Sequence, residues 1–283
     1  MEVGVFFTAG DGAIDIAEVA RTAEALGFGS LWLGEHVVLP VEYERVYPAS
    51  ETGEAPEYAG LLSSPLIALA RAAAVTKTIR LGTGVCLLPL HEPISLAKDI
   101  ATLDRDSGGR FLFGVGAGWM REETEILGGD FARRWRQIKD QVTAMKTLWS
   151  EEVAQHTGPY TRFPPVRLHP KPATRPHPPV LLGGASPRIF DRVAAWAEGW
   201  IPGISSVEEM REGLEKLTLA ARAHDRDPAT LTKVAFGLPG CLRRRDEIEA
   251  LRGMGIDHTT IWLDQREEGV LGELEALARA TLG

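Results

Sequence analysis

The sequence places a possible acid–base pair, Glu35 and His36, directly after a short apolar run, Ser30–Gly34. Histidine exchanges a proton near neutral pH, so His36 is a candidate proton donor or acceptor, and Glu35 is a candidate for orienting its ring. A histidine at a strand end can equally be structural and hydrogen-bond a loop carbonyl. The position of His36 alone does not separate these two interpretations.

Two glycine-rich turns are candidate anion-binding sites. In such turns backbone N–H groups can point at a ligand, and Ser186-Pro187 in the second turn has the pattern of a helix N-terminus, which favours a phosphate. A well-capped strand-to-helix turn without a ligand is the alternative. The candidate residues are Gly116, Ala117, Gly118 and Trp119 in the first turn and Gly183, Gly184, Ala185 and Ser186 in the second.

A third glycine-containing segment, Gly82-Thr83-Gly84-Val85, interrupts a run that otherwise reads as a strand. Glycine weakens the interior of a strand, so this segment predicts a bulge or a close approach of the backbone to a ligand. Four aromatic residues at or near strand ends could line an apolar substrate pocket, although buried aromatics more often belong to a core. These residues are Phe7, Trp32, Trp119 and Trp262.

Other chemistries have no motif in this sequence. There is no P-loop, no Gly-x-Ser-x-Gly elbow and no His-Glu-x-x-His pair. The two cysteines, Cys86 and Cys241, form no disulfide framework, and the seven histidines lack ligand spacing, so no metal site is predicted. Apart from His36, only His91 is expected near the face that carries the strand ends.

Eight β-rich runs alternate with helical runs along the chain, which predicts parallel strands joined by helical crossovers. A single (β/α)₈ TIM barrel over residues 1–283 fits this length better than a doubly wound sheet, which stays the alternative. The expected strands are Gly4–Thr8, Ser30–Gly34, Ile79–Leu88, Phe111–Val115, Val180–Leu182, Gly199–Ile201, Val234–Gly237 and Thr259–Leu263.

Local signals set the expected helix limits. Capping boxes are predicted at Asp15/Glu18, Ser206/Glu209 and Asp246/Glu249, and Ser64-Pro65 and Ser186-Pro187 are predicted helix starts. Three connections are longer than usual: one after the second strand, one after the fourth and one, with eight prolines, before the fifth. The first two leave strand ends at which barrel enzymes build their sites.

Composition narrows the class of protein. The 283 residues include 31 basic and 39 acidic ones, a net charge of −8, with 44% hydrophobic and 25% charged residues. This is typical of a globular enzyme that acts on a small molecule, and an acidic chain is a poor candidate for nucleic-acid binding. No apolar run approaches the ~20 residues of a membrane span, and no signal sequence is recognised, so we expect a cytoplasmic protein with no membrane partner.

Taken together, these segments resemble the luciferase-like monooxygenase family, particularly its deazaflavin-dependent branch. The resemblance covers nearly the whole chain. The matching segments are Leu31-Trp32-Leu33-Gly34-Glu35-His36, Arg80-Leu81-Gly82-Thr83-Gly84-Val85, Ser107-Gly108-Gly109-Arg110-Phe111, Gly114-Val115-Gly116-Ala117-Gly118-Trp119 and Pro179-Val180-Leu181-Leu182-Gly183-Gly184, together with Ala97-Lys98 and Ala101-Thr102-Leu103-Asp104.

This resemblance implies a TIM barrel, usually dimeric, with a flavin or deazaflavin at the C-terminal mouth. It aligns Gly84-Val85 with a non-prolyl cis peptide behind the ring, and Gly116–Trp119 and Gly183–Ser186 with the turns that hold the phosphate tail. His36 matches a catalytic histidine of several members. The candidate cofactor-binding residues on the third strand are Thr83, Gly84 and Val85.

Departures from the family pattern narrow the expected function. Pro40 and Trp119 replace residues that mark relatives oxidising sugar phosphates, and Val37 replaces a second histidine of many FMN oxygenases. The leading expectation is an oxidoreductase that moves a hydride between C5 of coenzyme F420 (a deazaflavin) and a small organic substrate. The alternatives are a two-component FMN monooxygenase with a separate reductase, and a non-catalytic flavin-binding protein.

Overall fold

The computed structural model of the chain describes residues 1–44, 46–47, 50–264 and 269–283. Its parallel strands close into a barrel, because β1 pairs with both β2 and β12, and β11 pairs with β9 as well as β12. The strands of the barrel are β1 (Glu2–Phe7), β2 (Ser30–Leu33), β3 (Arg80–Thr83), β4 (Cys86–Leu87), β5 (Phe111–Gly116), β8 (Val180–Gly183), β9 (Gly199–Ile201), β10 (Gly203–Ile204), β11 (Thr232–Gly237) and β12 (His258–Trp262).

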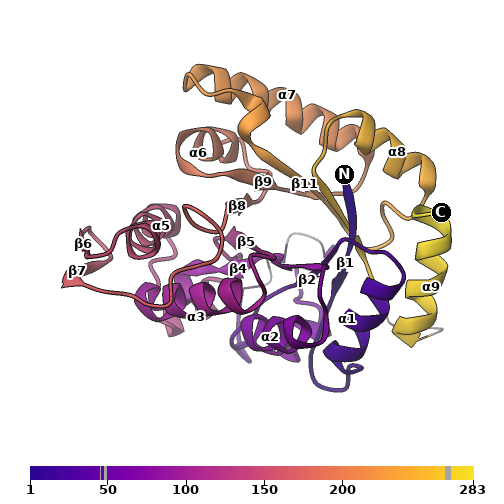
Figure 1. Cartoon of the computed structure of the whole chain (residues 1–283), viewed down its shortest axis with the longest axis horizontal. Coiled ribbons are helices and arrows are strands. Elements are labelled where there is room, and N and C mark those ends of the chain that lie inside the picture. The colour runs from indigo at the N-terminus through magenta and orange to yellow at the C-terminus, as the bar shows by residue number, and fades with distance from the viewer. Residues whose placement is uncertain (45, 48–49, 265–268) are drawn as a thin grey trace.

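Helices surround the barrel on the outside, as Figure 1 shows. The predicted (β/α)₈ TIM barrel is therefore confirmed, with β3/β4 and β9/β10 each filling one strand position. The helices are α1 (Ile16–Ala25), α2 (Pro65–Val75), α3 (Pro93–Asp106), α4 (Arg121–Ile126), α5 (Arg134–Ser150), α6 (Ile189–Trp196), α7 (Val207–Ala223), α8 (Arg245–Gly253) and α9 (Gly269–Thr281), with short 3₁₀ turns η1 (Glu57–Gly60), η2 (Leu88–Leu90) and η3 (Pro228–Thr230).

The core has two layers, because successive strand residues point to opposite faces. One layer lies between the strands and the helices and contains most buried aliphatic residues. The other fills the barrel interior with large side chains. It consists of Phe6, Trp32, Leu112, Leu181, Ile201, Val234 and Phe236, with Val85 and Trp262 packed against it.

The third strand is shorter than predicted. The run Ile79–Leu88 is expected as one strand, but β3 ends at Thr83, β4 covers only Cys86–Leu87, and η2 follows. The break falls at Gly84–Val85, whose peptide bond is cis. The interruption indicated by the glycines is thus confirmed, and so is the cis peptide implied by the family resemblance.

Two helix starts differ from the sequence prediction. The helix α6 begins at Ile189, and Ser186 contributes its carbonyl to Ile189 N–H at 2.8 Å instead of capping the helix with its side chain. The helix α8 begins at Arg245, two residues before the predicted site, and its box uses Glu247. Both Glu247 and Glu249 are spaced to close a capping box, so the sequence alone does not decide where α8 begins. The caps at Asp15 and Ser206 are confirmed, since each side chain accepts a backbone N–H.

Helical spacing in the sequence predicts that Leu66, Leu69, Ala70 and Ala73 form the buried stripe of α2, and half of this prediction is wrong. Leu69 and Ala73 are buried as expected, but Ala68 and Ala72 take the places expected for Leu66 and Ala70. Almost every position of this helix is apolar, so its periodicity does not select a face. As a result Leu66 is only half-buried, and Ile67 and Ala70 are exposed on the outside of the barrel.

All three long connections are confirmed. The one before β8 contains an antiparallel hairpin, β6 (Ala154–Thr157) and β7 (Arg162–Val166), at the periphery in Figure 1. The Asp140 carboxylate of α5 accepts N–H groups of Tyr160 and Thr161 in the hairpin. None of the helices in the described ranges has the length and apolar character needed to cross a membrane.

One surface carboxylate organises the start of β3 and leads to a stability prediction. Glu24 of α1 accepts the N–H groups of Lys77, Thr78 and Ile79 at 2.5–2.9 Å. Burial raises the pKa of Glu24, but these backbone bonds outweigh it and lower the pKa to about 2. Because the folded-state pKa lies below the ordinary value of 4.5, the stabilisation is complete above pH 4.5 and is lost as the pH falls towards 2.

Glu24→Gln is therefore expected to reduce the free energy of unfolding by about 1–2 kcal/mol at neutral pH, a value discounted for partial solvent exposure. The difference from wild type should shrink as the pH falls towards 3, because the unfolded chain binds a proton at Glu24 below pH 4.5 while the folded chain binds it only near pH 2. Urea unfolding from pH 7 to about pH 3 measures this. A difference that stays constant over that range would contradict the assignment.

Candidate active site

The centre of the candidate site is a hydrogen-bonded pair, His36 and Glu123. His36 follows β2, and Glu123 lies in α4, the short helix after β5. Nδ1 of His36 is 2.8 Å from Oε2 of Glu123, and the other oxygen accepts the N–H of Val37 at 2.7 Å. The two side chains are 11% and 2% exposed. The carboxylate thus holds both the imidazole ring and the backbone that follows it, and leaves Nε2 as the atom that can exchange a proton.

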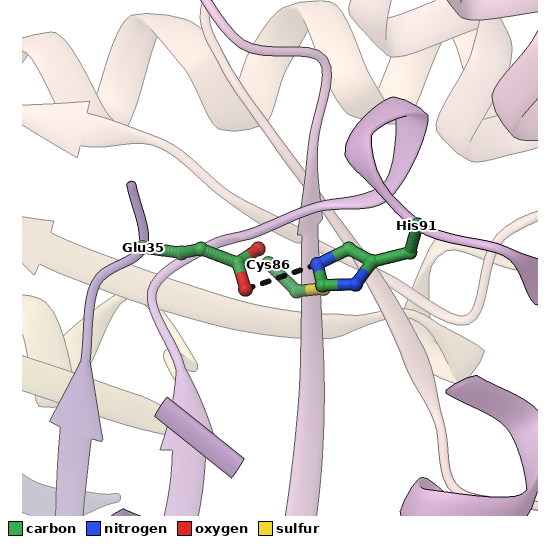
Figure 2. Close-up of side chains that lie close together, drawn as sticks. All are labelled: Glu35, Cys86 and His91. Atoms are coloured by element: carbon green, nitrogen blue, oxygen red, sulfur yellow. Dashed lines mark hydrogen bonds and ion pairs between the residues drawn. The ribbon is translucent and has the colours of Figure 1, made fainter. Parts of the chain in front are cut away.

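Glu35 does not orient His36, contrary to the expectation from their adjacency. Its carboxylate points the other way, accepting Leu87 N–H at 2.6 Å and lying 3.0 Å from Nε2 of His91, as Figure 2 shows for the side chains. Consecutive residues at a strand end project to different sides, which separates the two side chains. The positioning carboxylate is Glu123, 87 residues away in sequence, and no motif in the chain indicates it.

Trp119 lies against His36 in a group of aromatic rings. The His36 and Trp119 rings meet edge to face with centroids 5.7 Å apart, and the Tyr43 and Tyr47 rings contact Trp119 at 6.5 and 5.1 Å. The tyrosines come from the long loop after β2. Sequence reasoning did not select them, because loop residues there carry no periodic signal. This loop and the one after β5 together form an aromatic wall beside the candidate proton donor.

A second aromatic group lies over the barrel interior. Phe6 packs on Phe236 and Trp262 with ring centroids 4.9 and 4.3 Å apart, and Tyr58 reaches Trp262 at 5.9 Å. Burial, with the Tyr47 hydroxyl alongside, raises the pKa of Tyr58 well above its ordinary value, so this phenol is neutral at physiological pH. Trp119 and Trp262, both half-buried, remain candidates for lining a substrate pocket.

Phe7 and Trp32 cannot line an open pocket, contrary to the sequence prediction. Both are fully buried. Phe7 faces the helices, because the strand alternation turns Phe6 inward instead. Trp32 fills the barrel interior and donates its indole N–H to Ser30 Oγ at 2.8 Å. Gly82 beneath it is needed for space, since a Cβ there would lie 2.2 Å from the Trp32 ring.

The cis peptide places Val85 at the centre of the predicted cofactor region. A Cβ on Gly116 would lie 2.3 Å from Val85 Cγ2, and one on Gly183 would lie 3.1 Å from Cγ1. These glycines therefore let the β5 and β8 ends close around Val85. The buried hydroxyl of Thr83 donates to the Gly114 carbonyl of β5 at 2.8 Å. The structure thus brings the candidate residues of three strands together.

The two glycine-rich turns lie at the ends of β5 and β8, which are neighbours in the barrel. Gly118 and Gly184 have φ values of +72° and +114°, a region that favours glycine. Ala117 is buried, whereas Gly184, Ala185 and Ser186 are exposed with the residues up to the start of α6. Their backbone is accessible to a ligand, as the anion-site prediction requires.

Four arginines gather beside these turns, and sequence reasoning did not select them. Arg121 and Arg134 lie 4.7 and 3.9 Å from the Phe131 ring centroid, and Arg192 lies 4.5 Å from that of Trp135. We call this group, completed by Arg188 before α6, the arginine cluster. Burial and then the charge of Arg121 lower the pKa of Arg134; burial and then Arg188 lower that of Arg192.

Arg134 is the most enclosed member with unused hydrogen-bonding capacity. One of its terminal nitrogens donates to the Phe131 carbonyl at 2.7 Å, but its Nε is buried and finds no partner among the described residues. A buried N–H without a partner is costly, and guanidinium groups are well suited to phosphate and carboxylate oxygens. The cluster and the two turns therefore have the donors that an anionic group requires.

Comparison with known proteins agrees with this architecture. The luciferase-like monooxygenase family model matches residues 1–280. The chain is 36% identical over 262 residues to the uncharacterized protein Rv0953c of Mycobacterium tuberculosis, covering 90% of this chain and 92% of the relative. The monooxygenase RslO1 from Streptomyces bottropensis is similar in structure, with a TM-score of 0.69 and 27% identity, covering 90% of this chain and 75% of that one.

The same fold occurs in the coenzyme F420-dependent tetrahydromethanopterin reductase of Methanopyrus kandleri, with a TM-score of 0.76, 15% identity and coverage of 99% and 98%. A closed parallel barrel with a histidine–carboxylate pair at its C-terminal mouth defines a TIM-barrel enzyme. More particularly, the chain belongs to the luciferase-like monooxygenase family. The resemblance seen in the sequence is confirmed.

Proposed function

We propose that this enzyme is an F420-dependent oxidoreductase that transfers a hydride between the deazaflavin C5 and a small organic substrate. The observation that carries the proposal is the arginine cluster, with its unpartnered Arg134 Nε, beside two accessible backbone turns. F420 has a phosphodiester and a tail of carboxylates, whereas FMN ends in one phosphate. Several cationic groups suit the longer polyanion better.

The residues present fit such a cofactor. The arginine cluster and the turns around Gly118 and Gly184 would hold the anionic tail, and the Gly84–Val85 segment would lie behind the ring. When bound, the deazaflavin supplies the hydride chemistry at C5. The protein contributes orientation, a water-poor aromatic surface and a proton.

His36 is the proposed proton donor or acceptor. With Nδ1 held by Glu123, its Nε2 is the atom that can give a proton to the substrate or take one from it. The edge-to-face contact with Trp119 limits rotation of the imidazole ring and excludes water from one side. Glu123 stabilises the imidazolium form without touching the substrate, so it is a positioning residue.

A two-component FMN monooxygenase is the second candidate. The similarity to a monooxygenase, RslO1, at 27% identity over 90% of this chain favours it. That reaction would require reduced FMN from a separate reductase. A non-catalytic flavin-binding protein is disfavoured, because a buried histidine–carboxylate pair has a desolvation cost that ligand storage alone does not require.

Side-by-side titration of the purified protein with F420 and FMN tests the proposal. We expect micromolar or tighter binding of F420, at least ~10-fold tighter than FMN, a difference of about 1.4 kcal/mol. Assays with reduced F420 and a panel of ketones, aldehydes and enones should show turnover without O₂ consumption. Preference for FMN, with reduced FMN driving O₂ uptake, would replace the proposal by the second candidate.

A homodimer in the cytoplasm is also proposed. The family resemblance implies a dimer, and the outer face of α2 leaves the apolar side chain of Ile67 69% exposed. A second copy of the chain would cover this apolar face. Cys86 and Cys241 are both free thiols, which agrees with a reducing compartment.

A further inference from the structure

A buried carboxylate, a buried thiol and a half-buried imidazole converge on the side of the barrel rim away from His36. Glu35 follows β2, Cys86 lies in β4 and His91 follows η2. One potential ligand atom from each side chain lies within 4.8 Å of the other two. Figure 2 shows Glu35 and His91 pointing at each other, with the Cys86 sulfur beside the imidazole ring. No local motif indicates this group, because Glu35 and His91 are 56 residues apart in the sequence.

The backbone already holds the ligand atoms in place. Oε2 of Glu35 accepts the Leu87 N–H at 2.6 Å, which leaves Oε1 directed at Nε2 of His91. The main chain of His91 is fixed as well, since its carbonyl accepts the Gln141 side-chain amide at 3.1 Å. Hydrogen bonds that fix ligand orientation in this way are a regular feature of metal sites.

The group lacks a permanent positive charge. The Glu35 side chain is 4% exposed and Cys86 is 1% exposed, yet no lysine or arginine in the described ranges bonds to either. The Glu35 carboxylate bonds the Leu87 N–H and the His91 ring, and the His91 ring carries a positive charge only when it is protonated. A divalent ion would supply that charge and displace the thiol proton.

A metal ion could reach these three side chains through a groove on the surface. The groove between α2 and α3 has a volume of about 830 Å³, and both Glu35 and His91 line it. The His91 side chain is 25% exposed to this groove. Three protein ligands with one side open to solvent match the coordination of many zinc sites, in which water completes the tetrahedron.

We propose that Glu35, Cys86 and His91 bind one divalent transition-metal ion of the zinc type through Oε1, Sγ and Nε2. Sulfur, nitrogen and oxygen ligands together select Zn²⁺ or Co²⁺ over the hard ions Mg²⁺ and Ca²⁺, which prefer oxygen alone. The ion ties the end of β2 to the β4–η2 segment, one residue from His36. This site is separate from the F420 proposal and does not depend on it.

Metal titration of the full-length protein tests this site. Chelator-treated protein is titrated with Zn²⁺ by calorimetry and with Co²⁺ by absorption spectroscopy. We expect one ion per chain with micromolar or tighter affinity, a thiolate-to-cobalt charge-transfer band, and a higher Tm in the presence of Zn²⁺. Absence of one-to-one binding, or Co²⁺ binding without that band, would overturn the proposal.

Three variants locate the bound ion. Cys86→Ser and His91→Gln are each expected to weaken Zn²⁺ binding by at least about 100-fold, and Cys86→Ser to abolish the charge-transfer band. Cys241→Ser, at the other free cysteine, should bind both metals as wild type does. His91 is partly exposed, so its variant decides the question if Cys86→Ser fails to fold. Wild-type affinity in His91→Gln would show that the ion lies elsewhere.

Discussion

Replacement of Glu123 by glutamine is expected to lower kcat of the F420-linked reaction by about 100-fold, approaching the effect of His36→Ala. The carboxylate accepts from Nδ1 of His36 and stabilises the charge that the ring acquires when it takes a proton. An amide of the same shape removes that charge, and its NH₂ end cannot accept the second of the two bonds that the Glu123 oxygens make to His36 Nδ1 and to the Val37 N–H. The measurement is oxidation of reduced F420 with the carbonyl and enone panel, together with the dissociation constant for F420.

Two comparisons make this result specific. Glu122→Gln removes the same charge from the neighbouring position of α4, where the side chain accepts the Glu44 N–H, and should change kcat by less than about 2-fold. The dissociation constant for F420 should stay near the wild-type value in Glu123→Gln and His36→Ala. Unchanged turnover in His36→Ala would remove this histidine from the mechanism, and equal losses in Glu122→Gln and Glu123→Gln would remove the positioning role.

Arg134→Gln is expected to weaken F420 binding by about 10- to 100-fold, because each hydrogen bond to a charged group contributes about 1.5–3 kcal/mol. Arg134 has a buried Nε without a described partner and stacks 3.9 Å from the Phe131 ring, so it is the best-ordered donor of the arginine cluster. The wild-type affinity should fall with added salt, and the variant should show a smaller dependence. Fluorescence titration with F420 at two salt concentrations measures both.

Arg136→Gln is the matched control for this experiment. It lies two residues further along α5, is exposed, and changes the net charge of the protein equally. We expect its F420 affinity to match that of wild type. If Arg134→Gln and Arg136→Gln bind F420 equally well, the anionic tail does not lie in the arginine cluster. The cofactor assignment would then have to be reconsidered.

Two buried carboxylates at the barrel rim belong to two different candidate sites. Glu35 directly follows β2 and faces His91, whereas Glu123 lies in α4 after β5 and faces His36. The Glu123 pair opens towards the aromatic wall of the candidate active site, whereas the Glu35 pair lies beside the groove between α2 and α3. A residue pair adjacent in sequence, Glu35 and His36, is therefore split between two sites.

The succession of strands and helices could be predicted from the sequence, since it depends on local patterns. Apolar runs, glycine at helix ends and caps such as Asp15 and Ser206 act over a few residues, and eight repeats of the same pattern favour a barrel. The cis peptide at Gly84–Val85 could be predicted only from the family resemblance. Errors arose where the local pattern was degenerate, as in the uniformly apolar helix α2 or the competing acidic residues at the start of α8.

The sequence by itself determined which segments form strands and which strand ends carry His36, the glycine turns and the Gly84–Val85 break. The tertiary structure alone decided that Glu123 holds His36, that Phe6 instead of Phe7 faces the interior, and that Cys86 and His91 meet Glu35. The reason is that hydrophobic periodicity is a property of neighbours along the chain. Contacts between side chains tens of residues apart depend on the closure of the barrel and on the direction in which each strand end turns.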